Sequence, residues 1–168
     1  MSDQPQASAI TALPYRPCVG LMVLNQAGEI FAGQRLDSPY DAWQMPQGGI
    51  DEGETPQDAA LRELTEETGI DPDRIELLRE SAQWLRYDLP NQLVGQIWKG
   101  KFRGQSQRWF ALRFLGDDAE IQIETAEPEF RRWAWMSPSV LIDSIVPFKR
   151  DTYSAVFEEF RDILGAPG

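Results

Sequence analysis

The chain has 168 residues, 42% of them hydrophobic and 11% aromatic, which fits one folded domain and not a disordered segment. Its net charge of −11 argues against a broad basic face for long duplex nucleic acid, because such a face needs many phosphate contacts. That charge leaves open a site that holds one nucleic-acid end through a few arginines and a metal.

The sequence contains no histidine and one cysteine, Cys18. Ser-His-Asp and Cys-His catalysis, an internal disulfide, and zinc sites built from imidazoles or thiolates are therefore excluded. Acid–base and metal chemistry must rest on Asp and Glu, whose oxygens favour hard ions such as Mg²⁺ or Mn²⁺. The sequence shows neither a signal peptide nor an apolar run of about 18 residues, which favours a cytoplasmic protein without a membrane partner.

The first part of the chain predicts a tail and then a hairpin. Residues 1–12 are polar and small, and predict a flexible N-terminal tail in front of a single domain over residues 13–165. Apolar segments at 19–24 and 29–35, with turn residues between them, predict the hairpin. The Gly- and Pro-containing stretch 38–49 predicts a loop.

A helix with clear boundary signals follows this loop. Thr55 suits the N-cap, Pro56 suits the first helical position, and Gly69 suits the C-terminal cap. The pair Asp71-Pro72 stops any continuation.

The remaining segments predict a mixed α/β domain in which helices cover a sheet. Strands are expected at 83–89, 92–98, 107–115 and 130–136. A short helix is expected to begin at Ser137-Pro138. A terminal helix over 150–164 would bury a face made of Tyr153, Val156, Phe157, Phe160 and Leu164.

Three glutamates crowd the predicted helix. Glu63, Glu66 and Glu67 fall within an arc of about 100°, at the edge of its apolar face. A solvated acidic surface is the alternative explanation, but such surfaces usually interleave lysine with glutamate, and this helix carries only the cation Arg62. Because divalent cations relieve the repulsion among close carboxylates, the crowding predicts a cation site.

The stretch from Gly48 to Ile70 matches the pattern G-x5-E-x7-R-E-U-x-E-E-x-G-U, with U aliphatic, at every position. It resembles the signature of the Nudix hydrolases, which cleave nucleoside diphosphates linked to another group. The resemblance implies an α/β/α sandwich around a mixed β-sheet. The matching residues are Gly48, Glu54, Arg62, Glu63, Leu64, Glu66, Glu67, Gly69 and Ile70.

The resemblance also implies residue roles. Glu63, Glu66 and Glu67 would bind the metal, and one of Glu66 and Glu67 would also orient or deprotonate the attacking water; Arg62 joins them in the catalytic set. The backbone carbonyl of Gly48 would complete the metal shell, together with Glu129 from the block Pro128-Glu129-Phe130. Glu54 would pair with Arg62 to hold the loop against the helix, and Glu54 and Gly69 would be structural members of the motif.

Further blocks resemble the bacterial RNA pyrophosphohydrolases and related diadenosine tetraphosphate hydrolases, over residues 15 to about 160. The blocks are YRPCVG (15–20), WQMPQGG (43–49), WLRYDLP (84–90), GQSQRWF (104–110), PEF (128–130) and FKRDTY (148–153). This resemblance implies substrate-binding roles for Arg16, Arg35, Tyr87, Val146 and Lys149. As alternatives, Tyr87 packs in the interior and Arg35 caps a loop.

Tryptophans and a local basic segment offer further candidates. Residues 98–108 contain four basic side chains, Lys99, Lys101, Arg103 and Arg108, which either bind a polyphosphate or RNA backbone or form an exposed loop without a partner. The tryptophans are expected mostly in the core, with one near the cleft stacking a base. Those considered are Trp43, Trp84, Trp109, Trp133 and Trp135.

The leading hypothesis is an RNA pyrophosphohydrolase that uses metal-activated water to convert a 5′-triphosphate RNA end into a 5′-monophosphate and so promotes mRNA decay. Mg²⁺ is the expected metal, with Mn²⁺ or Zn²⁺ as alternatives. The partner is the 5′ end of RNA or, in a second hypothesis, a dinucleoside polyphosphate such as diadenosine tetraphosphate. A third hypothesis is a non-catalytic nucleotide-binding module. The sequence leaves open the oligomeric state, the number of ions and the phosphorus attacked.

Overall fold

A computed structural model describes residues 7–37 and 41–164. The helices are α1 (Ala7–Thr11), α2 (Pro56–Thr68), α3 (Pro138–Ser144), α4 (Arg150–Glu159) and α5 (Arg161–Leu164). The strands are β1 (Tyr15–Leu24), β2 (Ile30–Arg35), β3 (Trp43–Gln44), β4 (Gln47–Gly49), β5 (Ile75–Glu80), β6 (Leu85–Asp88), β7 (Gly104–Phe114) and β8 (Phe130–Met136). Four 3₁₀ turns are η1 (Pro72–Arg74), η2 (Trp98–Gly100), η3 (Asp118–Glu120) and η4 (Pro147–Lys149). No helix among the described residues is both long enough and apolar enough to cross a membrane.

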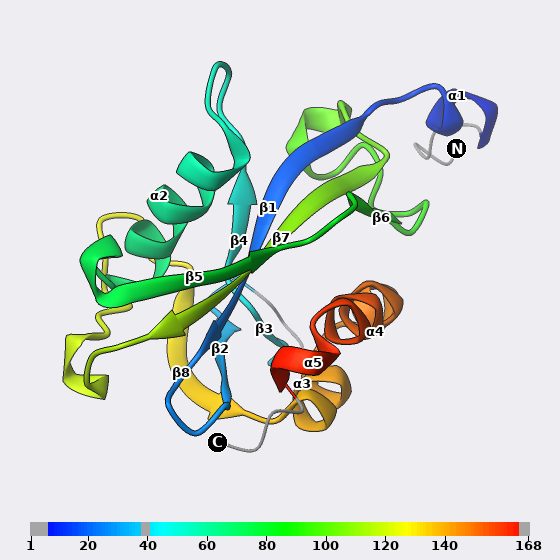
Figure 1. Cartoon of the computed structure of the whole chain (residues 1–168). Helices are drawn as coiled ribbons and strands as arrows, with labels where there is room; N and C mark the ends of the chain where they lie inside the picture. The colour runs from blue at the N-terminus through cyan, green and yellow to red at the C-terminus, as the bar shows by residue number, and fades with distance from the viewer. Residues whose placement is uncertain (1–6, 38–40, 165–168) are drawn as a thin grey trace.

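The strands form one mixed sheet. Its central order is β3-β2-β1-β7-β5, with β4 paired to β1, β6 to β7 and β8 to β2. β1 and β7 run parallel, whereas the other named pairs are antiparallel. α2 lies on one side of this sheet, and α3, α4 and α5 lie on the other (Figure 1). The arrangement confirms the predicted α/β/α sandwich.

From Cys18 to Leu24 the central strand β1 is buried on both faces, and this part of its sequence is a continuous apolar run. Because successive side chains point to opposite faces, Leu21 belongs to the core under α2 and Met22 belongs to the core under α3 and α4. On the first face Leu64 of α2 is fully buried, and on the second Tyr153 of α4 is 1% exposed. The two helical layers therefore rest on separate cores that share one sheet.

The boundaries of α2 confirm the predicted caps. The backbone N–H of Asp58 donates to Thr55 Oγ1 at 3.1 Å, and Pro56 begins the helix. Gly69 has φ 72°, and its N–H donates to the carbonyl of Thr65 at 2.9 Å. This left-handed conformation favours glycine, and an added Cβ would also lie 2.7 Å from the backbone oxygen of Gln122.

The N-terminal segment departs from the predicted tail. Residues 7–11 form α1, and Ile10 is 7% exposed in a small cluster with Tyr87, Leu89 and Val94. The single apolar side chain of Ile10 docks the segment on β6 and the following loop, which the polar composition did not predict. Residues 1–6 of the predicted tail, residues 38–40 of the predicted loop, and residue 165 of the predicted domain lie outside the described residues.

Four segments differ from the predicted elements. The strand expected at 92–98 is wrong: this segment forms turns that end in η2, and its apolar residues pack on the small cluster around Tyr87 instead of joining a sheet. The loop expected at 38–49 contains the short strands β3 and β4, and β5 was not predicted. The expected terminal helix is divided into α4 and α5 at Phe160, where φ is −105°.

Candidate active site

A cavity of about 750 Å³ opens beside the ends of β1, β4 and β7. Its walls differ in chemistry. The acidic wall is Glu63, Glu66, Glu67 and Glu129, and the basic wall is Arg16, Arg35 and Lys149. Ile97, Trp98 and Phe148 add an apolar rim. The size fits a nucleotide-sized ligand, and the two walls fit anions together with cations.

The acidic wall is held in a partly buried setting. Glu67 is 3% exposed, and burial raises its carboxyl pKa well above the ordinary value, with the charges of Glu63 and Glu129 acting in the same direction. Burial likewise raises the pKa of Glu63 to about 7, partly opposed by Arg62. These carboxylates repel one another, so a bound cation would stabilise their charged forms.

Glu129 reaches this wall from the loop before β8, about sixty residues beyond α2 in sequence. Burial raises the pKa of its carboxyl group, and its charge acts on both Glu63 and Glu67. The structure thus brings together the four acidic residues that the sequence analysis selected. Their role as metal ligands stays a prediction.

Gly48 provides space for the carboxylate of Glu63. A Cβ at this position in β4 would lie 2.0 Å from Glu63 Cδ, which is inside van der Waals contact. Only glycine lets the carboxylate approach the strand so closely. This fits the place of Gly48 in the motif, and the metal-binding role of its backbone carbonyl stays a prediction.

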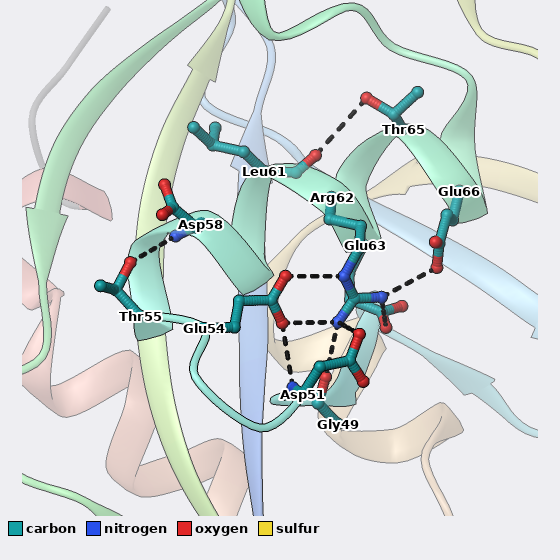
Figure 2. Close-up of polar contacts among 10 residues, drawn as sticks. All are labelled: Gly49, Asp51, Glu54, Thr55, Asp58, Leu61, Arg62, Glu63, Thr65 and Glu66. Atoms are coloured by element: carbon teal, nitrogen blue, oxygen red, sulfur yellow. Dashed lines mark hydrogen bonds and ion pairs between the residues drawn. The ribbon is translucent and has the colours of Figure 1, made fainter.

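Arg62 is the centre of a polar network that ties α2 to the preceding loop (Figure 2). Its Nε and Nη2 donate to the two oxygens of Glu54 at 2.8 and 2.9 Å, and Nη2 also donates to the carbonyl of Gly49 at 2.9 Å. Nη1 donates to Glu63 Oε1 at 2.9 Å and to Glu66 Oε2 at 3.1 Å. The pairing of Glu54 with Arg62 is as predicted.

This network makes stability depend on pH. Hydrogen bonds from Arg62 and from the backbone of Asp51 lower the pKa of Glu54 to about 2. Because the folded pKa lies below the unfolded value of about 4.3, the stabilisation is present above that value and is lost as pH falls towards 2. We expect Glu54→Gln to be less stable than the parent chain at pH 7, with the difference shrinking between about pH 5 and pH 2.

Urea unfolding of both proteins across this pH range measures the effect. Glu52→Gln is the matched control, because Glu52 is exposed in the same loop. A stability difference for Glu54→Gln that does not change with pH would show that the ionised pair does not hold the loop.

The donor set fits divalent cations. Among residues 7–37 and 41–164, no three or more Asp, Glu, Cys or His side chains are already grouped as a metal site. Glu63 and Glu66 each give one oxygen to Arg62 and keep the other, and Glu67 Oε2 is buried without a hydrogen-bond partner within the described chain. An unpartnered buried carboxylate oxygen beside further carboxylates fits a hard cation with oxygen ligands.

Three of the five predicted substrate-binding residues line the cavity. Arg16 lies against Gly49, where an added Cβ would be 2.6 Å from its Nη2, and its guanidinium carbon is 5.5 Å from the centre of the Trp98 ring. Arg35 donates two hydrogen bonds to Asp37 at 2.9 Å. Lys149 is 4% exposed, and burial together with the charge of Arg35 lowers its pKa to about 7.

The other two predicted substrate-binding residues are not among those that line the cavity. Tyr87 is 7% exposed and packs beside Phe148, with ring centres 5.8 Å apart, and Lys149 Nζ lies 5.7 Å from its ring centre. Val146 packs against the core beneath α4. Tyr87 thus packs in the interior and contacts Lys149, and the substrate-binding roles of Tyr87 and Val146 stay predictions.

Trp98 lines the cavity, although no sequence pattern indicated it as a base-stacking tryptophan. None of the five tryptophans considered is among the lining residues; Trp109, for example, is fully buried, and Trp84 lies on the surface near Arg108. Trp98 and Lys99 have φ 52° and 57°, strained values for residues other than glycine. No local pattern indicates such a turn in an apolar segment.

The basic segment 98–108 contributes little positive charge to the cavity. Arg103 pairs with Asp88 at 2.8 Å, and Arg108 pairs with Glu80 at 3.3 Å. Lys99 and Lys101 are exposed and are not among the lining residues. The exposed-loop alternative therefore describes Lys99 and Lys101, whereas Arg103 and Arg108 are partly buried in ion pairs and Arg108 belongs to β7. Trp98 and Gln105 are the members of the segment that line the cavity.

A model of the NUDIX domain matches residues 14–156, which is most of the chain. The chain belongs to the Nudix family. Proteins named RNA pyrophosphohydrolase are among its relatives: that of Dinoroseobacter shibae is 56% identical, covering 92% of this chain and 97% of its own. The one from Rhodospirillum rubrum is 53% identical over 95% of this chain and 94% of its own.

Solved structures share the Nudix fold at lower identity. An Ap4A hydrolase binary complex from C. elegans has a TM-score of 0.65 at 21% identity, covering 89% of this chain and 98% of its own. The E. coli dihydroneopterin triphosphate pyrophosphohydrolase has a TM-score of 0.64 at 20% identity, covering 84% and 96%. At these identities the likeness supports the fold and not a substrate.

Proposed function

We propose that this Nudix hydrolase removes pyrophosphate from 5′-triphosphate ends of RNA and leaves a 5′-monophosphate. The relatives that are more than half identical over nearly the whole chain carry the name of this activity. In the structure, the proposal is supported by the cavity itself, where the carboxylate wall, with its buried Glu67, meets the basic wall of Arg16, Arg35 and Lys149.

A triphosphate repels an incoming water or hydroxide because it carries several negative charges. Divalent cations neutralise this charge, polarise the phosphoryl oxygen and increase the acidity of water. Glu63, Glu66, Glu67 and Glu129 would hold the cations, with the carbonyl of Gly48. Oxygen ligands favour Mg²⁺ first and Mn²⁺ next. Zn²⁺ fits less well, since the chain lacks histidine and its only thiol, Cys18, is buried.

The basic wall binds and orients the phosphates. Lys149 is buried and its pKa is near 7, so an adjacent phosphate anion would favour the charged ammonium and gain a strong hydrogen-bond donor. Arg16 is held between Gly49 and the Trp98 ring, and Arg35 by Asp37, so both guanidinium groups are positioned before substrate binds. One of Glu66 and Glu67 would orient or deprotonate the attacking water.

An assay on 5′-triphosphorylated RNA tests this function. We expect the purified protein to produce 5′-monophosphate ends with Mg²⁺, detected by a monophosphate-dependent exonuclease, and to stop when EDTA removes the metal. In the cytoplasm a monophosphate end would commit a transcript to decay. Triphosphate ends that persist while diadenosine tetraphosphate is cleaved would reject RNA as the substrate, and failure on both substrates would reject the hydrolase.

A further inference from the structure

A row of buried polar side chains extends along β7 to the cavity. Gln105, Gln107 and Trp109 are alternate residues of this strand and therefore share one face. They are 2%, 1% and 0% exposed. Gln105 lines the cavity, and so does Gln47 of the neighbouring strand β4. Buried amides must satisfy their hydrogen bonds within the protein or with a ligand.

Trp109 fixes the orientation of Gln107. The indole Nε1–H of Trp109 lies 3.0 Å from Gln107 Oε1. An indole nitrogen donates and does not accept, so the atom that faces it must be the amide oxygen. The ring is itself fixed, because it lies over Gly20, where an added Cβ would be 2.4 Å from it, and packs edge-on against Tyr153 at 5.8 Å.

Gln107 in turn fixes two further amides. Its Nε2 donates to Gln105 Oε1 at 2.7 Å and to Gln47 Oε1 at 3.2 Å. Both amide hydrogens of Gln107 are thereby used, and rotating either partner amide would place two N–H groups against each other. The oxygens of Gln47 and Gln105 therefore face Gln107, and their NH₂ groups face the other way.

These NH₂ groups complete the basic wall. Within the described chain neither donates a hydrogen bond to another protein group, and both residues line the cavity together with Arg16 and Lys149. The cavity thus presents neutral donors beside its cations and turns the amide oxygens away. Together with Arg16 and Lys149, these two amide NH₂ groups donate hydrogen bonds, which suits the oxygens of a polyphosphate.

We propose that Gln107 is a positioning residue that sets the hydrogen-bond polarity of the cavity, so that Gln47 and Gln105 donate to the phosphate oxygens of the substrate. This deepens and rests on the proposed function, since it assigns donors for the triphosphate of that same site. Gln107 does not line the cavity itself. It accepts a hydrogen bond from Trp109 and donates hydrogen bonds to the two amides that line the cavity.

Gln107→Met tests the proposal, because methionine has nearly the same volume but neither donates nor accepts as an amide does. With Gln107 removed, the amides of Gln47 and Gln105 can turn either oxygen or nitrogen to the cavity. We expect the Kd for inorganic tripolyphosphate, measured by calorimetry, and the KM for triphosphorylated RNA to rise about tenfold, with kcat changed much less. Gln26→Met, at the opposite end of the sheet where Gln26 bonds the carbonyl of Phe114, should change neither value.

A spectroscopic measurement on the parent chain does not depend on how well the variant folds. The side-chain NH₂ resonances of Gln47 and Gln105, assigned by their own methionine variants, should shift when tripolyphosphate is added, and the resonance of Gln107 should shift far less. Unmoved Gln47 and Gln105 resonances under saturating tripolyphosphate, or an unchanged Kd in folded Gln107→Met, would overturn the proposal. Because it is judged by tripolyphosphate binding, its failure is distinct from a failure to process RNA.

Discussion

Replacing Glu67 with glutamine is expected to lower kcat on triphosphorylated RNA by about 10³-fold or more while the protein stays folded. Glutamine has the same shape but lacks the negative charge that a divalent cation requires, and losing one such ligand removes several kcal/mol of transition-state stabilisation. Single-turnover assays with saturating Mg²⁺ measure the effect. Glu76→Gln, an exposed substitution on β5, is the control and should keep full activity.

The same substitution should make the metal-free protein more stable. Burial raises the pKa of Glu67, so the protonated carboxyl group favours the folded state. This contribution to the free energy of unfolding is lost as pH rises from the unfolded pKa of about 4.3 through the raised folded pKa. Glutamine stays neutral, so at pH 7 without metal we expect the Tm to rise by a few degrees. Such a gain in stability is common when a functional residue is replaced. A Glu67→Gln protein with undiminished kcat would remove Glu67 from the catalytic set.

Gly48→Ala is expected to reduce kcat/KM by about 10²-fold with little loss of stability. The new Cβ would lie 2.0 Å from Glu63 Cδ, so the flexible carboxylate must move away from β4 while the backbone stays in place. A displacement of about 1 Å in a catalytic group is enough for a loss of this size. Kinetics and thermal unfolding of the same preparation would separate the two effects.

A double-mutant cycle identifies the cause of this loss. If Gly48→Ala acts by displacing Glu63, then adding it to Glu63→Gln should cost much less than it costs alone, because the carboxylate is already impaired. Additive effects in the cycle would show that Gly48 serves the site by another route, such as through its own backbone carbonyl.

Local signals explain why α2 could be predicted to the residue. Thr55, Pro56 and Gly69 each act on their own backbone neighbourhood, so the caps depend little on the rest of the fold. The strand predicted at residues 92–98 was wrong because apolar residues indicate burial but do not indicate which part of the protein they pack against. There Val94 and Ile97 pack on the cluster around Tyr87, and Trp98 turns with positive φ.

Charge and helical spacing alone indicated the cation site of Glu63, Glu66 and Glu67. The family resemblance was needed to indicate the other charged residues of the cavity, Glu129, Arg16, Arg35 and Lys149. The burial of Lys149 depends on its contacts with Tyr87 and Phe148. Tyr87 is distant in sequence, and the adjacent Phe148 does not indicate by itself that the lysine is buried. The roles of Gln105 and Gln107 depend on a tryptophan lying over Gly20 on a parallel strand. Neutral amides carry no periodic or charge signal, so only tertiary contacts disclose their orientation.

Cation binding tests the central claim most directly, and it needs no substrate. Mn²⁺ titrations followed by electron paramagnetic resonance would compare the parent chain with Glu63→Gln/Glu129→Gln and with Glu76→Gln/Glu158→Gln, a double variant of equal charge whose two sites are exposed. We expect the parent chain and the surface variant to bind Mn²⁺ equally, and the cavity variant to bind at least about 100-fold more weakly. Equal affinity in all three proteins, or no Mn²⁺ binding by the parent chain, would contradict a cation site built by α2 and the loop before β8.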